Sequence, residues 1–358
     1  MAKVIITNAI VFDGHALQEK ATVTIENGLI SSINSSADTS NATIVDGRGQ
    51  TLLPGLIDAH VHLNNDTEKA AVLLSQLAKA GVTTALDMGH FSGAVRNSLT
   101  NYPGIAELYI AGNFATATGS LHSRMTKATL IDSPESAVQF VEDRVAEGAD
   151  YIKIVADVPG PSQEVIDTLV REARRHGKLT VAHAATLKAF PMAQKGKVDI
   201  ITHVPMDLPL DEASVRLMKD EGRASVPTLV MAETVVNAKM FPGLIYETAK
   251  KSVAELHKAG VPIMAGTGAN QTAMASVKHG ESLHQELKLL VDAGLSTEEA
   301  LKSCTSLPAK WFRLENRGEI AVGKRADLVL VDGNPLEDIT ATGKVKRVWI
   351  AGKEVELD

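Results

Sequence analysis

The middle of the chain repeats one pattern eight times, a short apolar run followed by a helical or loop stretch. The runs are GLIDAHVH, TTALDMG, ELYIAGNF, YIKIVAD, LTVAHAA, IITHVP, ASVPTLVM and PIMAGTGA. Near-continuous apolar runs are typical of parallel strands that are buried on both faces. The pattern predicts an α/β fold, specifically a (β/α)8 TIM barrel of roughly 250 residues. A doubly wound open sheet is the competing topology. We favour the barrel because polar residues lie near the carboxyl ends of several different strands.

Both ends of the chain have a different pattern, with short β-branched runs separated by turns. KVIITNAIVFDG and ATVTIENGLISSI lie near the start, and GKRADLVLVDG and KVKRVWIAGKEVELD lie near the end. Asn-Gly and Asp-Gly pairs between such runs are strong turn signals. We therefore expect residues 1–54 and 315–358 to build one small β-sandwich, and residues 55–314 to form the barrel.

Composition excludes several classes of protein. The net charge of -7 leaves no basic stripe for a nucleic-acid backbone. No segment reaches the roughly 18 apolar residues of a membrane span, and the first residues lack a secretory signal pattern. The single cysteine, Cys304, excludes an internal disulfide and a cysteine-based zinc site. We expect a cytoplasmic protein without nucleic-acid or membrane partners.

The first predicted barrel strand ends in DAHVH, which gives His60 and His62. On a strand, this i, i+2 spacing puts both imidazoles on the same face, so two nitrogens can converge on one metal ion. Two alternating histidines alone are more often surface or packing residues, and the remaining strands decide between these interpretations.

Lys153 lies between two isoleucines in the fourth run, YIKIVAD. An unpaired ammonium buried inside a barrel is costly, so the amine tends to lose its proton. A neutral lysine amine can take up carbon dioxide, and the resulting carbamate is an anionic oxygen ligand able to bridge two cations.

His183 and His203 lie near the ends of the fifth and sixth runs. Either alone is more often a core histidine than a ligand. Together with the two histidines of the first strand and Lys153, they supply enough ligands for two divalent ions such as zinc, with positions left for water and substrate.

The combined motifs resemble the amidohydrolase superfamily, and within it the imidazolonepropionase-like and Xaa-Pro dipeptidase-like enzymes. They are LLPGLIDAHVHL, YIKI, VAHA, THV, HGESLHQELKLLVDAGLSTEEALKSCTSLPAKW and GEIAVGKRADLVLVDGNPLEDI. The resemblance covers nearly the whole chain and is far more specific for the superfamily than for a substrate. It implies that His60 and His62 hold a buried metal and that His183 and His203 hold a more exposed one. It also implies that carbamylated Lys153 bridges the two.

The eighth run departs from this family pattern. Relatives have Gly-Thr-Asp at its end, where this chain reads AGTGAN with Gly268 at the position of the aspartate. In the family that aspartate binds the buried metal and carries the catalytic proton. Losing a positioned general acid/base costs about 10² to 10⁴ in rate, so we expect impaired activity. Asn270 would face the same side if the strand continued. Asp87 is more simply interpreted as a loop-capping carboxylate.

Several further residues are weaker candidates. His122 resembles the position where relatives carry a histidine that polarises the substrate carbonyl, and Arg124 could pair with a substrate carboxylate. Each is nearly as simply explained as a loop residue. His90, His279 and His284 are further candidates for contact with the substrate. The remaining histidines, His15, His176 and His257, are expected at the surface.

These features together predict a binuclear metal-dependent hydrolase of a small-molecule amide, such as a dipeptide, an N-acyl amino acid or an aryl amide. Esters, carbamates and lactones stay open as substrates because the same metal centre can attack them. The alternatives are a metal- and ligand-binding protein without turnover, and a deaminase of the same superfamily, against which Lys153 counts. The resemblance also implies a homo-oligomer.

Overall fold

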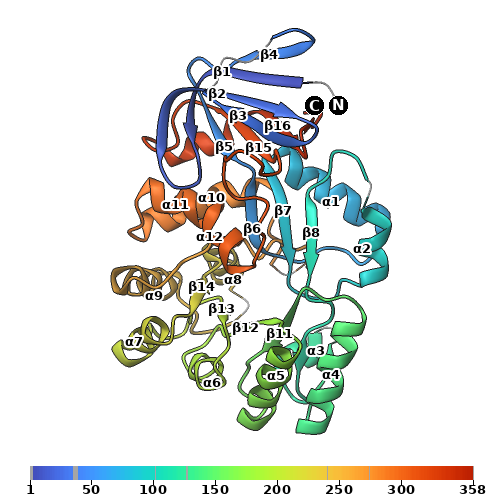
Figure 1. The fold of residues 1–358 in the computed structure, drawn as a ribbon. Coiled ribbons are helices and arrows are strands. Elements are labelled where there is room, and N and C mark those ends of the chain that lie inside the picture. Colours follow the sequence, from blue (N-terminus) through green and yellow to red (C-terminus); the bar gives the residue numbers. More distant parts are fainter. Residues whose placement is uncertain are drawn as a thin grey trace.

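The computed structural model describes residues 3–34, 39–100, 102–125, 128–239, 241–273 and 275–357. In this part of the chain an eight-stranded sheet lies at one end of the molecule, and parallel strands with helices around them make up the rest (Figure 1). β1, at the start of the chain, and β16, near its end, both belong to this sheet (Figure 1).

The eight-stranded sheet contains strands from both ends of the chain, in the order β17-β16-β15-β5-β1-β2-β3, with β4 paired to β1. β15 runs antiparallel to β5, with Leu328 opposite Pro54, and so ties the C-terminal part of the chain to the N-terminal part. The strands are β1 (Lys3–Phe12), β2 (Leu17–Glu26), β3 (Leu29–Ile33), β4 (Ala42–Asp46), β5 (Gln50–Pro54), β15 (Leu328–Asp332), β16 (Val345–Ile350) and β17 (Lys353–Glu354). The division into a sandwich and a barrel at residues 54 and 315 stays a prediction.

Alternation along these strands gives the sheet two apolar faces. In β5, Leu52 belongs to the sheet's own core, whereas Leu53 packs into the main core of the molecule. β15 repeats this pattern, since Leu328 and Leu330 face the first core and Val329 faces the second. Successive side chains of a strand point to opposite faces, so the sheet packs against the rest of the chain while enclosing a core of its own.

The remaining strands form two parallel sheets. The first consists of β6 (Leu56–Val61), β7 (Val82–Asp87) and β8 (Glu107–Ile110). The second has the order β10-β9-β11-β12-β13-β14, with β9 (Ala115–Thr116), β10 (Thr129–Leu130), β11 (Tyr151–Val155), β12 (Leu179–His183), β13 (Ile200–Thr202) and β14 (Ala224–Val226). β6, β7, β11, β13 and β14 are buried throughout, which agrees with the near-continuous apolar runs of the sequence.

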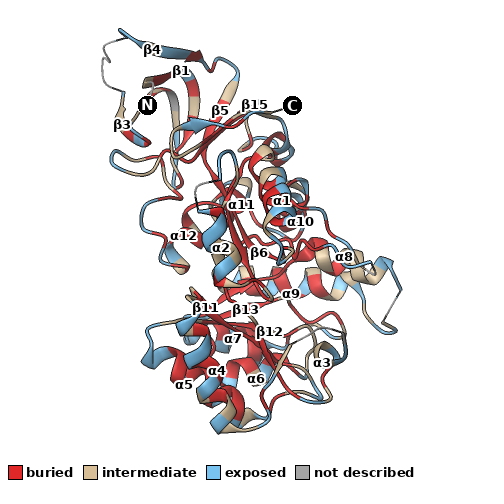
Figure 2. Cartoon of the chain, turned by 90° about the vertical axis from the view of Figure 1, so that its right-hand side faces the viewer, coloured by how far each residue is buried: buried red, intermediate tan, exposed pale blue. Residues whose placement is uncertain are grey.

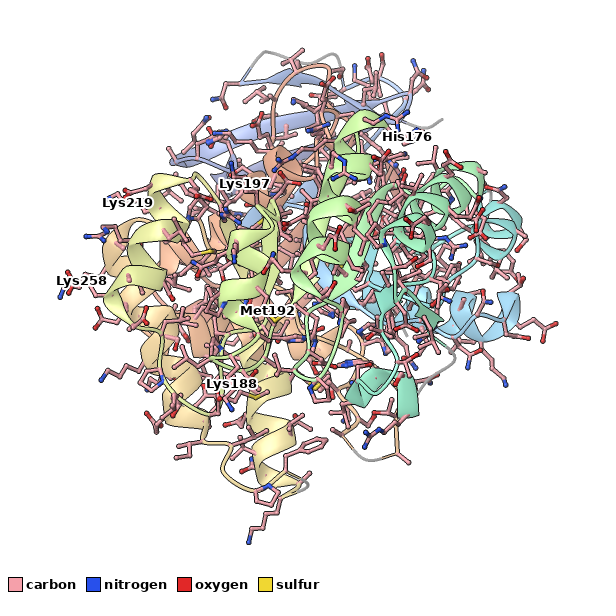
Figure 3. The ribbon with its side chains drawn as sticks, turned by 90° about the horizontal axis from the view of Figure 1, so that it is seen from below. His176, Lys188, Met192, Lys197, Lys219 and Lys258 are labelled. Atoms are coloured by element: carbon pink, nitrogen blue, oxygen red, sulfur yellow. The ribbon has the colours of Figure 1, made fainter. Side chains whose placement is uncertain are left out.

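Helices surround the parallel strands and turn their buried faces inward (Figure 2). α5 illustrates the cause, since its buried residues recur at the spacing of one helix face and Ser162 caps its first turn. The outer faces are polar: Lys219 and Lys258 point outward from α7 and α9 (Figure 3). The helices are α1 (Thr67–Lys79), α2 (Gly93–Leu99), α3 (Leu121–Met125), α4 (Pro134–Ala146), α5 (Gln163–Arg175), α6 (Phe190–Lys195), α7 (Glu212–Asp220), α8 (Leu229–Asn237), α9 (Tyr246–Ala259), α10 (Glu281–Asp292), α11 (Thr297–Ser303), α12 (Ser306–Trp311) and the 3-10 helix η1 (Ile339–Gly343).

The eighth predicted strand lacks a regular ladder. In residues 261–270 only isolated bridges occur, parallel ones from Ile263 to Ser225 and from Ala269 to Val61, and an antiparallel one from Asn270 to Val277. The segment nevertheless lies between the two parallel sheets, because Met264 donates to the Ser225 carbonyl on one side and Ala59 donates to the Ala265 carbonyl on the other. Gly268, near the end of the segment, has a φ of +67°, in the left-handed region.

Candidate metal centre

His60 in β6 and His62, directly after this strand, meet at their outer nitrogens. The Nε2 atoms of His60 and His62 lie 3.1 Å apart. The other ring nitrogen of His60, Nδ1, lies 2.5 Å from the hydroxyl of Thr202 at the end of β13. Two ligands about 2.1 Å from one tetrahedral ion lie about 3.4 Å apart, so this pair has the separation of two ligands of one metal. The hydroxyl orients the imidazole, as outer partners of metal-binding histidines do.

His203 and His183 continue the row of imidazoles. The ring of His203 lies 5.0 Å from that of His60, and the ring of His183 lies 4.5 Å from that of His203. His203 has a φ of +64°, and its Nδ1 lies 2.5 Å from the hydroxyl of Thr228. Burial lowers the pKa of His60, His183 and His203 well below the ordinary value. Neutral imidazoles keep the lone pair that a metal ligand needs.

Lys153 lies in the middle of β11 and is 2% exposed. Its Nζ atom has no hydrogen-bond partner. Burial lowers the pKa of Lys153 well below its usual value, and the nearby charge of Asp87 opposes this only in part. A buried amine without a partner is costly as an ammonium, so the structure favours a neutral amine beside the imidazoles.

Gly268 contacts the site through its backbone, since its N–H donates to the carbonyl of His60 at 2.8 Å. Its φ of +67° is the left-handed region that L side chains rarely adopt. A Cβ atom added here would lie 3.0 Å from the Cβ and 3.2 Å from the Cε of Met231 in α8. Met231 therefore fills the space into which a side chain at position 268 would extend.

Asn270 does not replace the missing carboxylate. Its amide nitrogen donates to the carbonyl of Gly268 at 2.9 Å, and its amide oxygen accepts from the backbone of Thr272 at 2.8 Å. These bonds hold the loop that follows. The expectation that Asn270 would face the same side as residue 268 assumed a continuous strand, which the backbone does not form here.

Two buried carboxylates support the backbone around the site. Asp87 accepts from the N–H groups of Leu63 and Gly89, as a loop-capping residue does, and burial raises its pKa to about 7. Asp58 accepts from His60 and from both the backbone and the hydroxyl of Thr267, and burial raises its pKa to about 6. Both carboxylates are therefore occupied by these hydrogen bonds.

His122 lies beside the ligand row, whereas Arg124 does not reach it. The Nδ1 atom of His122 lies 2.8 Å from an oxygen of Asp157, and its ring lies 4.5 Å from that of His183. Arg124 is exposed and donates to the carbonyl of Gly119 at 3.2 Å. Burial alone would raise the pKa of Asp157, but hydrogen bonding from His122 and the nearby imidazole of His183 hold it below the ordinary value.

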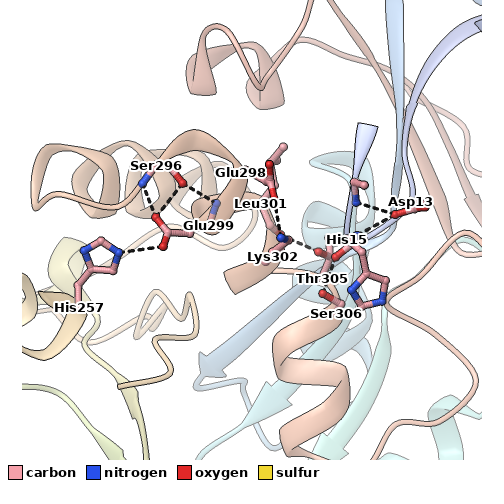
Figure 4. Close-up of polar contacts among 12 residues, drawn as sticks. Asp13, His15, His257, Ser296, Glu298, Glu299, Leu301, Lys302, Thr305 and Ser306 are labelled. Atoms are coloured by element: carbon pink, nitrogen blue, oxygen red, sulfur yellow. Dashed lines mark hydrogen bonds and ion pairs between the residues drawn. The ribbon is translucent and has the colours of Figure 1, made fainter. Parts of the chain in front are cut away.

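The other candidate histidines have mainly structural contacts. His279 lies 3.1 Å from the carbonyl of His62, and His284 bridges Thr342 and the Ala80 carbonyl. Two histidines lie at the surface, as expected: His257 pairs with Glu299 at 3.0 Å, and the backbone of His15 is held by Asp13 (Figure 4). The side chain of His90 packs 4.5 Å from the ring of Phe114.

Sequence reasoning missed Asp157, Met231 and the two threonines that orient His60 and His203. Asp157 had a visible signal, because it is the last residue of the fourth run, YIKIVAD, and polar residues of parallel strands gather at such ends. Met231 had none, since its contact with Gly268 depends on how α8 packs over the end of β14.

Two cavities, of about 660 and 460 Å³, lie away from these residues. Asp150, directly before β11, lines both. Glu107, the first residue of β8, lines the larger cavity, and Leu179, the first residue of β12, lines the smaller one. Both cavities are therefore near the amino ends of these strands, and none of the predicted site residues lines them.

The sequence profile of the Amidohydrolase family matches residues 51–355. The chain belongs to this family. Its fold is similar to that of a crystallised Xaa-Pro dipeptidase with methionine in its active site, with a TM-score of 0.86 and 26% identity over 99% of this chain and 100% of the other. It is 24% identical to an imidazolonepropionase of Idiomarina loihiensis, over 95% of this chain and 93% of the relative. It is 26% identical to an ochratoxinase of Aspergillus niger, over 95% and 84% of the two chains.

Family membership makes metal binding the expected chemistry of the imidazole row. Among the described residues, none of the amidohydrolase's helices combines the length and apolar character that crossing a membrane needs.

Proposed function

We propose that this amidohydrolase is a metal-dependent hydrolase of amide-type carbon-nitrogen bonds. One observation carries the proposal: four imidazoles, in or directly after β6, β12 and β13, adjoin in one row, and the Lys153 amine is buried without a hydrogen-bond partner. Relatives named as an Xaa-Pro dipeptidase, an imidazolonepropionase and an ochratoxinase support the same class of reaction.

We further propose that the two parallel sheets form one closed (β/α)8 barrel. The hydrogen bonds from residues 261–270 to β14 and to β6 support closure on one side. On the other side, the backbone of Asp150 donates to the carbonyl of Ile110 at the end of β8. In such a barrel, the candidate site lies at the carboxyl ends of the strands, where barrel enzymes bind substrate.

The donor set fits two divalent ions, most simply zinc. His60 and His62 would hold the buried ion, His183 and His203 the exposed one, and a carbamate on Lys153 would bridge them. The partnerless Nζ atom supports this fit, because an oxyanion formed there would gain cations as partners. Bound ions of this kind lower the pKa of a bridging water and polarise a substrate carbonyl. The chain itself orients the ligands through Thr202 and Thr228.

The substrate is proposed to be a small molecule: a dipeptide, an N-acyl amino acid or an aryl amide. His122 borders the ligand row and is proposed to contact the substrate. Arg124 is exposed and is proposed to bind a substrate carboxylate after changing rotamer. We also propose a cytoplasmic homo-oligomer, for which light scattering of the purified chain provides the test.

A second candidate function is metal and ligand binding without turnover. Gly268 and Met231 favour it, because the strand-eight side of the site presents a glycine and a thioether in place of a carboxylate. Neither group can accept and return a proton.

The test compares zinc-loaded and chelator-treated protein on one panel of dipeptides, N-acyl amino acids, aryl amides, esters, lactones and aminated nucleobases. Hydrolysis of an amide that is lost with the metal and with His60→Ala supports the proposal. The exposed His176→Ala is the control and should keep full activity. Bound zinc without turnover of any compound would support the binding protein, and ammonia release from a nucleobase would support a deaminase.

A further inference from the structure

A carboxylate lies against the imidazole row at its His183 end. Gly268 contacts the other end, at His60. His122 in α3, Asp157 after β11 and His183 at the end of β12 each offer one ligand atom, and these atoms all lie within 4.8 Å of one another. All three side chains are partly buried, with 25%, 17% and 15% of their surface exposed. They come from three separate segments, so the cluster is a product of the fold and not of local sequence.

The separations in this cluster suit a bound ion. His122 Nδ1 lies 2.8 Å from one oxygen of Asp157, and His183 Nε2 lies 3.8 Å from the other. These two values lie on either side of the roughly 3.4 Å between two ligands of one tetrahedral ion. The distance to His183 is too long for a hydrogen bond. A hydrogen-bonded pair therefore accounts for His122 and Asp157, but not for the approach of His183 to the second oxygen.

The other carboxylates beside the site are used elsewhere. Asp58 is held by His60 and Thr267, and Asp87 by Leu63 and Gly89. Position 268 carries no side chain, and Met231 fills the space beside it. Asp157 is thus the carboxylate that the fold directs toward the histidines.

We propose that His122, Asp157 and His183 hold a divalent ion, with Asp157 as its anionic ligand. The proposal deepens the proposed function, on which it rests for an ion at His183, and it makes His122 a ligand in place of a substrate contact. Two imidazoles and one carboxylate form a donor set for zinc. Of the other three ligand histidines, His60 and His62 would serve the buried ion, and His203, the neighbour of His183 in the row, would stay a ligand of the ion at His183.

Zinc titration of the metal-free chain by calorimetry tests this inference with Asp157→Asn. Asparagine keeps an oxygen that accepts a hydrogen bond from His122, but it lacks the negative charge. We expect one ion to bind at least about 100-fold more weakly, a larger loss than the typical effect of removing an outer hydrogen-bond partner, which is about 10- to 100-fold. Asp220→Asn, an exposed aspartate at the end of α7, is the matched control and should bind as the unmodified chain does.

Unchanged stoichiometry and affinity in Asp157→Asn would overturn the inference and leave the proposed function standing. Zinc binding that depends on Asp157, in a chain that hydrolyses none of the substrates of the panel, would support the inference and contradict the proposed function. Circular dichroism melting of each variant verifies that it is folded. A zinc-soaked crystal gives a second readout: an anomalous peak about 2.0–2.2 Å from an Asp157 oxygen supports ligation, and zinc peaks that all lie beyond 3.5 Å contradict it.

Discussion

Gly268 and Met231 form a contact that explains how the site accommodates the missing aspartate. A side chain at position 268 meets Met231 at 3.0 Å and must adopt a left-handed backbone conformation, which costs roughly 1–2 kcal/mol for most residues and less for aspartate. Restoring the carboxylate alone therefore leaves it crowded. The two positions form a matched pair, and one is best changed together with the other.

Gly268→Asp combined with Met231→Ala should raise amide turnover at least about 100-fold over Met231→Ala alone, since a positioned general base contributes about 10² to 10⁴. Gly268→Asp alone should gain less, because Met231 still occupies the space. The measurement is the rate of each zinc-loaded variant on a single responsive amide. Equal rates for Gly268→Asp and for the double variant would show that Met231 does not obstruct the carboxylate.

The sequence predicted the histidine arrangement better than the acidic groups. An i, i+2 pair on one strand must place both imidazoles on the same face, and the Nε2 atoms of His60 and His62 do lie 3.1 Å apart. Asp157 and Met231 act through contacts between distant segments. No local spacing in the sequence encodes such contacts.

Among the elements, α8 has the closest link to the site. It follows β14 directly, and Thr228, which precedes it, orients His203. The buried Glu286 of α10 accepts from the N–H groups of Leu229 and Val230, at 3.0 and 2.8 Å. An acidic side chain at a helix N-terminus satisfies otherwise unpaired N–H groups. α10 therefore positions the helix that carries Met231.

Burial raises the pKa of Glu286 to about 8, well above the roughly 4.3 of an unfolded chain. Its protonated form is favoured in the folded state, so its contribution to stability is full below about pH 4 and is lost as the pH rises toward 8. We expect the free energy of unfolding to fall across this window. Glu286→Gln should remove the part of this decrease that comes from ionisation of Glu286. Urea unfolding at several pH values is the measurement. The exposed Glu281→Gln in the same helix is the control, and a pH-independent difference between Glu286→Gln and the unmodified chain would contradict this account.

The alternation of apolar runs with helical stretches predicted the parallel strands. The eighth run, however, forms isolated bridges in place of a regular strand. β6, β7, β11, β13 and β14 come from apolar runs because both of their faces are buried, and that cause acts residue by residue. Residues 261–270 contain a similar apolar run, yet they form only isolated bridges. Hydrophobicity alone does not distinguish these two outcomes.

At the scale of the whole molecule, the two chain ends depend on one another. Trp349 of β16 is fully buried in the core of the terminal sheet, together with Ile6 of β1 and Leu52 of β5. Turn signals at both ends predicted strands there. They could not predict which strands pair, because pairing across nearly the full length of the chain depends on the fold between them.

Trp349→Ala should lower the free energy of unfolding by about 3–5 kcal/mol, as large-to-small changes of buried aromatic residues do. It should also speed hydrogen exchange in β1, which is more than 300 residues away in sequence but shares the same core. Trp311→Ala, in α12 outside that core, should leave β1 exchange unchanged. If the β1 amides of Trp349→Ala stay as protected from hydrogen exchange as those of the unmodified chain, the two ends are independent.

Lys153 and the four histidines are proposed to form a binuclear metal centre, and the number of zinc ions bound per chain tests this proposal. We expect two ions in the reconstituted protein, and at most one in Lys153→Met, because methionine cannot form the bridging carbamate. Lys188→Met, an exposed lysine, is the matched control and should keep both ions. The measurement is elemental analysis by mass spectrometry after removal of unbound zinc. An unmodified chain without zinc, or a Lys153→Met chain that keeps both ions, would contradict the account.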